Sequence, residues 1–125
     1  MNIQNDCKYT KSHEWVKELD DGCVLIGLDD YAQDQLGELV FVNLPEVGDE
    51  VTAGEAFGDV ESVKAVSDVF SGVTGRVAEV NDELSSNPQK INEDPYGAWI
   101  IKVEEVSAFG ELMDADAYKA YCESL

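Results

Sequence analysis

The sequence predicts a mainly β domain, a small sandwich or flattened barrel, with one short helix in its first third and another at its C-terminus. Short apolar, β-prone stretches recur over the first hundred residues and are separated by turns rich in Gly and Pro. The predicted helices are confined to residues near 30–36 and to the C-terminal segment after Ser107. The 125 residues are expected to form a single domain, 1–125, which is long enough to bury a core without staples.

The first elements follow from apolar runs and turn residues. Tyr9 to Lys17 is expected to be one strand, and Val24 to Leu28 a short apolar strand after the turn at residues 20–22. Asp29 or Asp30 is expected to cap a helix over residues 31–36, which Gly37 ends. Residues 38–44 predict a well-buried strand, and residues 45–49 a turn.

Residues 56–70 predict a β-hairpin with Lys64 at or near its tip. An inert surface lysine is the commoner interpretation of any single lysine. A site of covalent attachment is the other, because lysine has a long flexible stem and an amine that can be acylated with loss of its charge. Small neighbours at 62 and 65 leave room for a modifying enzyme, and Glu61 and Asp68 offer it handles. The spacing by itself leaves both interpretations open.

The second half continues the pattern of strands and turns. Residues 71–75 predict a Gly-rich turn, 76–80 an alternating strand, 81–94 mostly loop with room for one helical turn, and 98–103 a strand after the turn at 95–97. Ser107 is expected to cap a short helical turn over residues 109–113. Asp114 is expected to cap a helix from Ala115 to Glu123, with Leu112, Tyr118 and Tyr121 as its apolar contacts.

The composition excludes several functions. The formal net charge of −19 argues against nucleic acid and anionic membranes as partners. It is compatible with solubility, with halophilic adaptation, or with steering toward basic faces of partner enzymes. No apolar run approaches the ~20 residues of a membrane span. The N-terminus has no pattern of a signal or transit peptide, so a cytoplasmic location is expected.

Candidate metal, disulfide and catalytic residues are few. Three widely spaced cysteines and a single histidine, His13, predict neither a zinc site nor a disulfide framework, and no metal site is expected. Paired aspartates occur at 20–21, 29–30, and 114 and 116. Their places in turns and at helix N-termini explain them without a role as metal ligands. His13 is expected to be a structural, hydrogen-bonded residue. Trp15 and Trp99 are expected in the core.

Ser12 and Glu14 form a further candidate pair. As strand residues two apart they would project from the same face. The simplest interpretation is a solvated face of the strand.

The string Glu61-Ser62-Val63-Lys64-Ala65, followed by Ser67-Asp68, resembles the lipoylation motif of the glycine cleavage system H proteins. Biotin carriers flank their lysine with methionines instead. The resemblance extends over nearly the whole chain, through the segments Tyr9–Trp15, Asp30–Val42, Leu44-Pro45, Val47-Gly48, Asn92–Gly97 and Trp99, with Tyr118 at the aromatic position of the terminal helix.

The resemblance implies a fold and a site. The fold is the barrel-sandwich hybrid of lipoyl and biotinyl carriers. Lipoate would be bound covalently to Lys64 as an amide. A lipoyl ligase or a lipoyl/octanoyl transferase would recognise the flanks Glu61, Ser62, Val63, Ala65 and Asp68. Ser12 and Glu14 would lie at a cleft that receives the aminomethyl-loaded arm, where a carboxylate can hold a protonated amine.

The resemblance also implies a role as a carrier and not an enzyme. The protein would take the aminomethyl group of glycine from the pyridoxal-phosphate glycine decarboxylase to the aminomethyltransferase, and dihydrolipoamide dehydrogenase would reoxidise the arm. We expect a monomer. Two alternatives remain: an H-like protein that mainly relays lipoyl groups to other proteins, and an unmodified acidic interaction domain.

Overall fold

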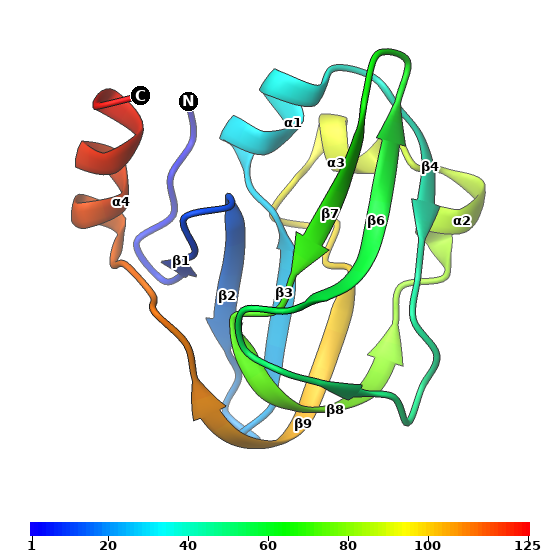
Figure 1. Cartoon of the computed structure of the whole chain (residues 1–125), viewed down its shortest axis with the longest axis vertical. Helices are drawn as coiled ribbons and strands as arrows, with labels where there is room; N and C mark the ends of the chain where they lie inside the picture. The colour runs from blue at the N-terminus through cyan, green and yellow to red at the C-terminus, as the bar shows by residue number, and fades with distance from the viewer.

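Two antiparallel sheets pack together in the computed structural model, which describes residues 1–125 (Figure 1). The larger sheet has the strand order β1-β2-β3-β9-β8-β5, and the smaller has the order β4-β6-β7. The strands are β1 (Lys8–Tyr9), β2 (Glu14–Glu18), β3 (Val24–Leu28), β4 (Leu39–Asn43), β5 (Glu50–Val51), β6 (Ala56–Ser62), β7 (Val66–Phe70), β8 (Val73–Val80) and β9 (Ile101–Phe109). The helices are α1 (Asp30–Leu36), α2 (Glu83–Ser86), α3 (Lys90–Glu93) and α4 (Ala115–Glu123). The predicted mainly β sandwich is confirmed.

The main core lies between the two sheets. Strands of the larger sheet contribute Val16, Ile26 and Ile101, and those of the smaller contribute Val42 and Val60, all nearly inaccessible to solvent. Burying each such side chain stabilises the fold by about 1.5–3 kcal/mol. The core therefore holds the β6–β7 hairpin firmly against the larger sheet.

Two helices and one strand occur where the sequence predicts them. Strand β3 spans Val24–Leu28 as expected. Asp29 accepts a hydrogen bond from the backbone of Ala32 and caps α1, and Gly37, with φ of 78°, ends it. Asp114 caps α4 in the same way through the Ala117 N–H. These elements depend on local signals, which the sequence carries.

The predicted strand from Tyr9 to Lys17 is wrong, because the chain reverses inside it. Tyr9 on β1 pairs with Trp15 on β2, and the turn between them is closed by the Thr10 N–H donating to the Glu14 carbonyl at 3.0 Å. His13 takes a positive φ of 73° in this turn. Ser12 therefore lies in a turn and not in a strand.

Strand β4 is less buried than the sequence predicts. Leu39 and Val42 are buried, but Val40 and Phe41 are 50% and 48% exposed. A bulge between Leu39 and Phe41 shifts the pairing with β6, and β4 is an edge strand. A bulge places successive residues off the regular alternation, so two apolar side chains reach the surface together.

The prediction is also wrong over parts of residues 71–113. Strand β8 already begins at Val73, inside the expected turn, and β9 starts at Ile101 and continues to Phe109. No helical turn follows, because Met113 instead exchanges backbone hydrogen bonds with Tyr9. The segment 81–94 contains two short helices, α2 and α3, in place of one turn.

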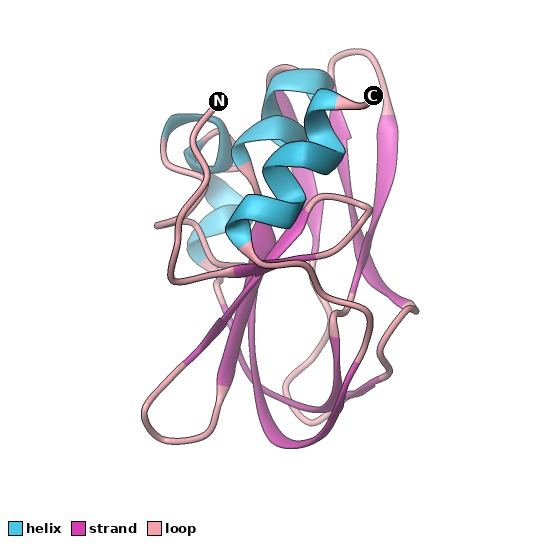
Figure 2. Cartoon of the chain, turned by 90° about the vertical axis from the view of Figure 1, so that its left-hand side faces the viewer, coloured by secondary structure: helices cyan, strands magenta, loops and turns pink.

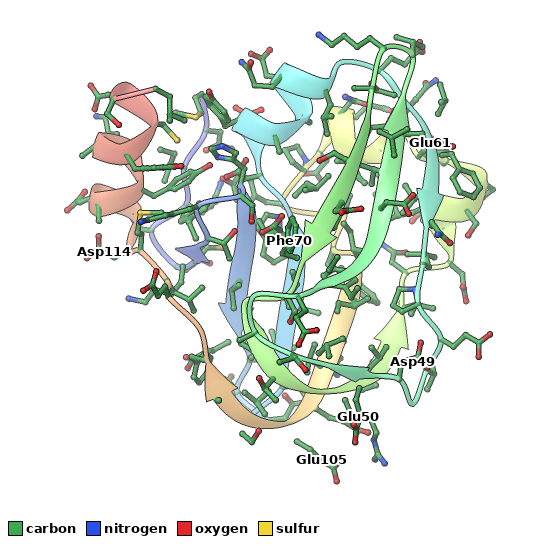
Figure 3. All side chains as sticks on the ribbon, viewed as in Figure 1. Asp49, Glu50, Glu61, Phe70, Glu105 and Asp114 are labelled. Carbon is green, nitrogen blue, oxygen red and sulfur yellow. The ribbon has the colours of Figure 1, made fainter.

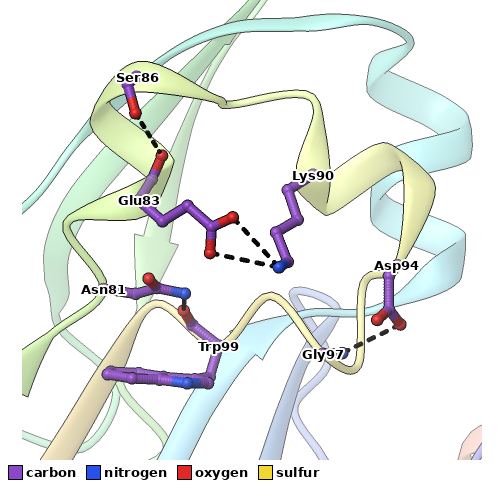
Figure 4. A network of polar contacts seen from close by, with 7 residues as sticks. All are labelled: Asn81, Glu83, Ser86, Lys90, Asp94, Gly97 and Trp99. Atoms are coloured by element: carbon purple, nitrogen blue, oxygen red, sulfur yellow. Dashed lines mark hydrogen bonds and ion pairs between the residues drawn. The ribbon is translucent and has the colours of Figure 1, made fainter.

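Polar contacts fix that segment (Figure 4). Lys90 of α3 pairs with Glu83 of α2 at 3.2 Å. The Asn81 side chain donates to the Trp99 carbonyl at 2.8 Å, and the Gly97 N–H donates to Asp94. The loop is thereby attached to the start of the last strand.

A second apolar cluster joins α4 to the first two strands. Figure 2 shows α4 packed in front of the sheet beside the N-terminal segment. The cluster consists of Cys7, Tyr9, Trp15, Ala115, Tyr118 and Cys122. Trp15 is buried as predicted, whereas Trp99 is only partly buried at the edge of this cluster. All three cysteines are free thiols. No helix has the length and apolar character needed to cross a membrane.

Candidate functional site

The β6–β7 hairpin carries Lys64 at its tip, as the sequence predicts. Glu61 pairs with Val66, and only the residues between them form the turn. The hairpin extends beyond its neighbouring strands, near α1 (Figure 1), and Glu61 lies on its upper part (Figure 3). Lys64 is exposed. The fold thus presents this lysine at one extremity of the molecule.

Ser62 shapes the turn. Its hydroxyl oxygen accepts hydrogen bonds from the backbone N–H of Lys64 at 3.2 Å and of Ala65 at 3.0 Å. Its own N–H donates to the Ala65 carbonyl at 2.8 Å, and the Val63 N–H donates to the Glu38 carbonyl at 3.1 Å. Ser62 is only 9% exposed, so its hydroxyl serves the turn and is not displayed to a partner.

The Lys64 amine has no acidic partner. Lys17, Lys90, Lys102 and Arg76 all form ion pairs, but Lys64 forms none. Its side chain runs past Gly37, where an added Cβ would lie 3.5 Å from Lys64 Cε. The amine is therefore accessible and not engaged in a salt bridge.

Asn92 of α3 supports the base of this tip. Its side-chain oxygen accepts from the Leu39 N–H at 2.9 Å, and its amide nitrogen donates to the Gly37 carbonyl at 2.8 Å and to Gln33. These bonds fix the connection from α1 to β4. Since Val63 is bonded to Glu38 in that connection, Asn92 indirectly positions the Lys64 turn.

A cavity of about 570 Å³ opens beside the other end of the hairpin. It lies between the β1–β2 turn, the end of β7 and the segment after β9, with Phe70 near the centre of the view in Figure 3. It is lined by Thr10, Lys11, Ser12, Ala53, Gly54, Phe70, Ser71, Gly72, Gly110 and Glu111.

Glu14 lies behind the wall of this cavity and is fully buried. Its carboxylate accepts hydrogen bonds from the Thr10 hydroxyl, from the Ser12 hydroxyl at 2.6 Å and from the Phe70 N–H at 3.3 Å. Burial raises the pKa of Glu14, and these hydrogen bonds oppose the rise. The solvated face expected for Ser12 and Glu14 is wrong for Glu14, because the reversal at His13 turns it into the fold.

Ser12 and Glu14 are nevertheless in contact, as two members of a polar group with Thr10 and Phe70. Thr10 and the Phe70 backbone are members of this group that the sequence did not predict. Thr10 could have been suspected as a hydroxyl four residues before a buried acid, but the Phe70 contact has no signal in the sequence.

A second buried network stands next to Glu14. The Tyr118 hydroxyl of α4 donates to Asp29, and it also forms a 2.6 Å hydrogen bond with His13 Nδ1. The prediction that His13 is hydrogen-bonded is confirmed. Burial raises the pKa of Asp29 to about 7, and the nearby Glu14 charge adds to the rise. No group of three or more His, Cys, Asp and Glu side chains is arranged to hold a metal ion.

Comparisons with known proteins agree with one another. The sequence model of the family described as glycine cleavage H-protein matches residues 7–125. A probable glycine cleavage system H protein of Pyrococcus horikoshii is 56% identical, covering 98% of this chain and 94% of that protein. A glycine cleavage system H protein of Treponema denticola is 51% identical, covering 98% and 100%. The crystal structure of a glycine cleavage system H protein from Mycobacterium marinum superposes with a TM-score of 0.91 at 43% identity, covering 98% and 100%.

Proposed function

The chain belongs to the glycine cleavage H-protein family, and on that premise we propose that Lys64 is the residue to which its lipoyl group is attached. Membership makes the chain a lipoyl carrier of the glycine cleavage system and not an enzyme, working with the other components of that system. Within this role it carries the aminomethyl group of glycine from the glycine decarboxylase to the aminomethyltransferase. Dihydrolipoamide dehydrogenase then reoxidises the dithiol of the lipoyl arm.

The exposed, unpaired amine of Lys64 on a fixed turn is the observation that carries the proposal. A modifying enzyme needs an accessible amine, and Lys64 has no acidic partner that would have to be displaced. Attachment forms an amide between Nζ and an activated carboxyl group, and the leaving group and a proton depart. Bound there, the lipoyl group supplies a dithiolane that accepts the carried group and the electrons.

The cavity beside Phe70 lies toward the far end of the strand that follows Lys64. Phe70 is six residues after Lys64, which corresponds to about 20 Å at about 3.3 Å per residue. An extended lipoyl-lysine, with bonds of about 1.5 Å between its chain atoms, spans roughly 14 Å from the lysine Cα. The arm can therefore lie along most of the hairpin, with its loaded end directed toward the cavity.

The polar group of Thr10, Ser12 and Glu14 suits a cationic load at that end. Both hydroxyls donate to the Glu14 carboxylate. The Thr10 oxygen also accepts from the Glu14 N–H, so it keeps one lone pair, and the Ser12 oxygen keeps two, to accept from a protonated amine. The Glu14 carboxylate, behind the cavity wall, supplies the negative charge that complements the amine. In this arrangement Ser12 and Thr10 touch the load, and Glu14 acts mainly through them.

The chain contributes a tether and a charged surface. A tether makes each encounter effectively intramolecular once a partner has docked. The net charge of −19 favours association with basic faces of the partner enzymes.

Intact mass spectrometry tests this function. The protein isolated from lipoate-replete cells is expected to carry one lipoyl increment, and peptide mapping is expected to place it on Lys64. Absence of any increment under these conditions would contradict the proposal and favour an unmodified acidic interaction domain.

A further inference from the structure

The outer face of the smaller sheet, below the Lys64 turn, is unusually apolar. Phe41 on β4, Glu61 on β6 and Val66 on β7 are paired in register, so their side chains share one face. Phe41 is 48% and Val66 66% exposed, and Val63 at the tip is 67% exposed. We call Val40, Phe41, Val63 and Val66 the tip patch.

Acidic side chains continue the same face away from the tip patch. Two pairs further along the strands, and so on the same face, Asp59 stands directly opposite Asp68. Like charges in this position destabilise a sheet, and no lysine or arginine neutralises either of them. Lys64 is the only Lys or Arg between Lys17 and Arg76. The face therefore combines exposed apolar groups with uncompensated negative charge.

We propose that the tip patch and the pair Asp59–Asp68 dock the enzyme that acylates Lys64, which presents an apolar depression rimmed by Lys and Arg. The inference rests on the proposed attachment at Lys64 and adds residues of β4, over twenty positions upstream of the lysine. Apolar side chains at the centre of an interface and opposite charges around it are the usual arrangement for specific association.

Selection of one lysine among seven is the reason for this choice of partner. Lys8, Lys11 and Lys119 are exposed and unpaired, as Lys64 is. Accessibility alone therefore cannot direct acylation to Lys64. What distinguishes Lys64 is the adjacent tip patch, since half of the exposed large apolar residues of the chain lie there. Phe41 lies on a different strand, so an enzyme that contacts it recognises the folded hairpin and its neighbour together.

The experiment follows acylation of the unmodified protein by purified lipoyl ligase with lipoate and ATP, measured by intact mass. Phe41→Ser is compared with Phe109→Ser, because Phe109 has nearly the same exposure, 49%, but lies at the end of β9, away from the tip (Figure 1). We expect kcat/KM for Phe41→Ser to fall about tenfold through KM, the loss typical of an interface aromatic. Phe109→Ser is expected to match the wild type.

Asp59→Asn tests the charged part of the surface. It is expected to raise the melting temperature, because the repulsion of Asp68 is relieved, and to lower kcat/KM for acylation about threefold. If Asp59 had only a structural role, the melting temperature and kcat/KM for acylation would change in the same direction. A higher melting temperature with a lower kcat/KM is therefore specific to docking.

Equal acylation kinetics for the wild type and Phe41→Ser would overturn the proposed docking role of this surface while leaving Lys64 as the attachment site. Normal acylation of Phe41→Ser with impaired loading by the glycine decarboxylase would assign the patch to that enzyme and equally overturn the inference. A wild-type protein that is not acylated at Lys64 would overturn the proposed function itself.

Discussion

The backbone N–H of Phe70 donates a hydrogen bond of 3.3 Å to Glu14 Oε2. This bond joins the last residue of the hairpin that carries Lys64 to the strand behind the candidate cavity. Phe70 lines the cavity and Glu14 backs it, so one contact fixes both the hairpin and the polar group to which its arm would return.

Substitution of Glu14 is expected to weaken retention of the loaded arm without affecting its attachment. Glu14→Gln and Glu14→Ala should be lipoylated normally, because the ligase acts at the distant tip. After loading by the decarboxylase and removal of that enzyme, ammonia should be lost faster without tetrahydrofolate. A charged hydrogen bond is worth about 1.5–3 kcal/mol when sheltered, so we expect about a tenfold acceleration for Glu14→Ala and a smaller one for Glu14→Gln.

Glu18→Ala is the matched control for Glu14, since it removes an exposed glutamate from the same strand. Equal release rates for the wild type and Glu14→Ala would assign Glu14 a structural role only. Lower thermal stability of Glu14→Ala alone would not support the functional role, because three hydrogen-bond donors lose their acceptor.

Lys64→Arg is expected to abolish the carrier function and leave the fold unchanged. Arginine keeps the positive charge but is not an acceptor for lipoylation. The free energy of unfolding should change by no more than about 0.5 kcal/mol, as for other surface substitutions. Glycine decarboxylation by the reconstituted system is the measurement. Lys119→Arg, which replaces an exposed lysine of α4, is the control. Wild-type turnover by Lys64→Arg would remove Lys64 as the attachment site.

Ser62→Ala is expected to loosen the turn that presents Lys64. The N–H groups of Lys64 and Ala65 lose their acceptor, which should cost about 1 kcal/mol. Hydrogen exchange of the amides at 64 and 65 should accelerate, and lipoylation should slow. Ser67→Ala, in the adjacent strand, serves as control because its hydroxyl donates only to the carbonyl of Asp68. Unchanged exchange at the tip would show that the backbone bonds suffice.

The raised pKa of Asp29 predicts a pH-dependent contribution to stability. Its pKa is about 7 in the folded protein, against an ordinary 3.8, so the folded state holds the proton more tightly. The resulting stabilisation is fully present below pH 3.8 and is lost as the pH rises through about 7. The melting temperature of the wild type relative to Asp29→Asn should therefore be higher at pH 5 than at pH 8.

Comparison with Asp29→Asn isolates this contribution, since the lowered pKa of His13 acts in the opposite direction and is present in both proteins. We expect the difference in melting temperature between the wild type and Asp29→Asn to change by about 5 °C between pH 5 and pH 8. This corresponds to roughly 1 kcal/mol of stability in a chain of this size. A pH-independent difference would show that Asp29 ionises normally in the folded protein.

Local signals in the sequence determined much of the fold and the proposed attachment site. The helix from Asp30 is set by the Asp29 cap and by Gly37, and α4 is set by Asp114. The hairpin that presents Lys64 follows from β-prone residues on both sides of a short turn. Each of these depends on contacts within a few residues, so the amino-acid order is sufficient to predict them.

Tertiary structure alone decided the surroundings of the site. Glu14 is buried because the chain reverses at His13 and brings β2 against Phe70, 56 positions away. Tyr118 reaches Asp29 across 89 positions, and the bulge in β4 exposes Phe41 where the sequence pattern predicts burial. Such contacts depend on which strands become neighbours, and the free energy that selects that arrangement is spread over the whole core.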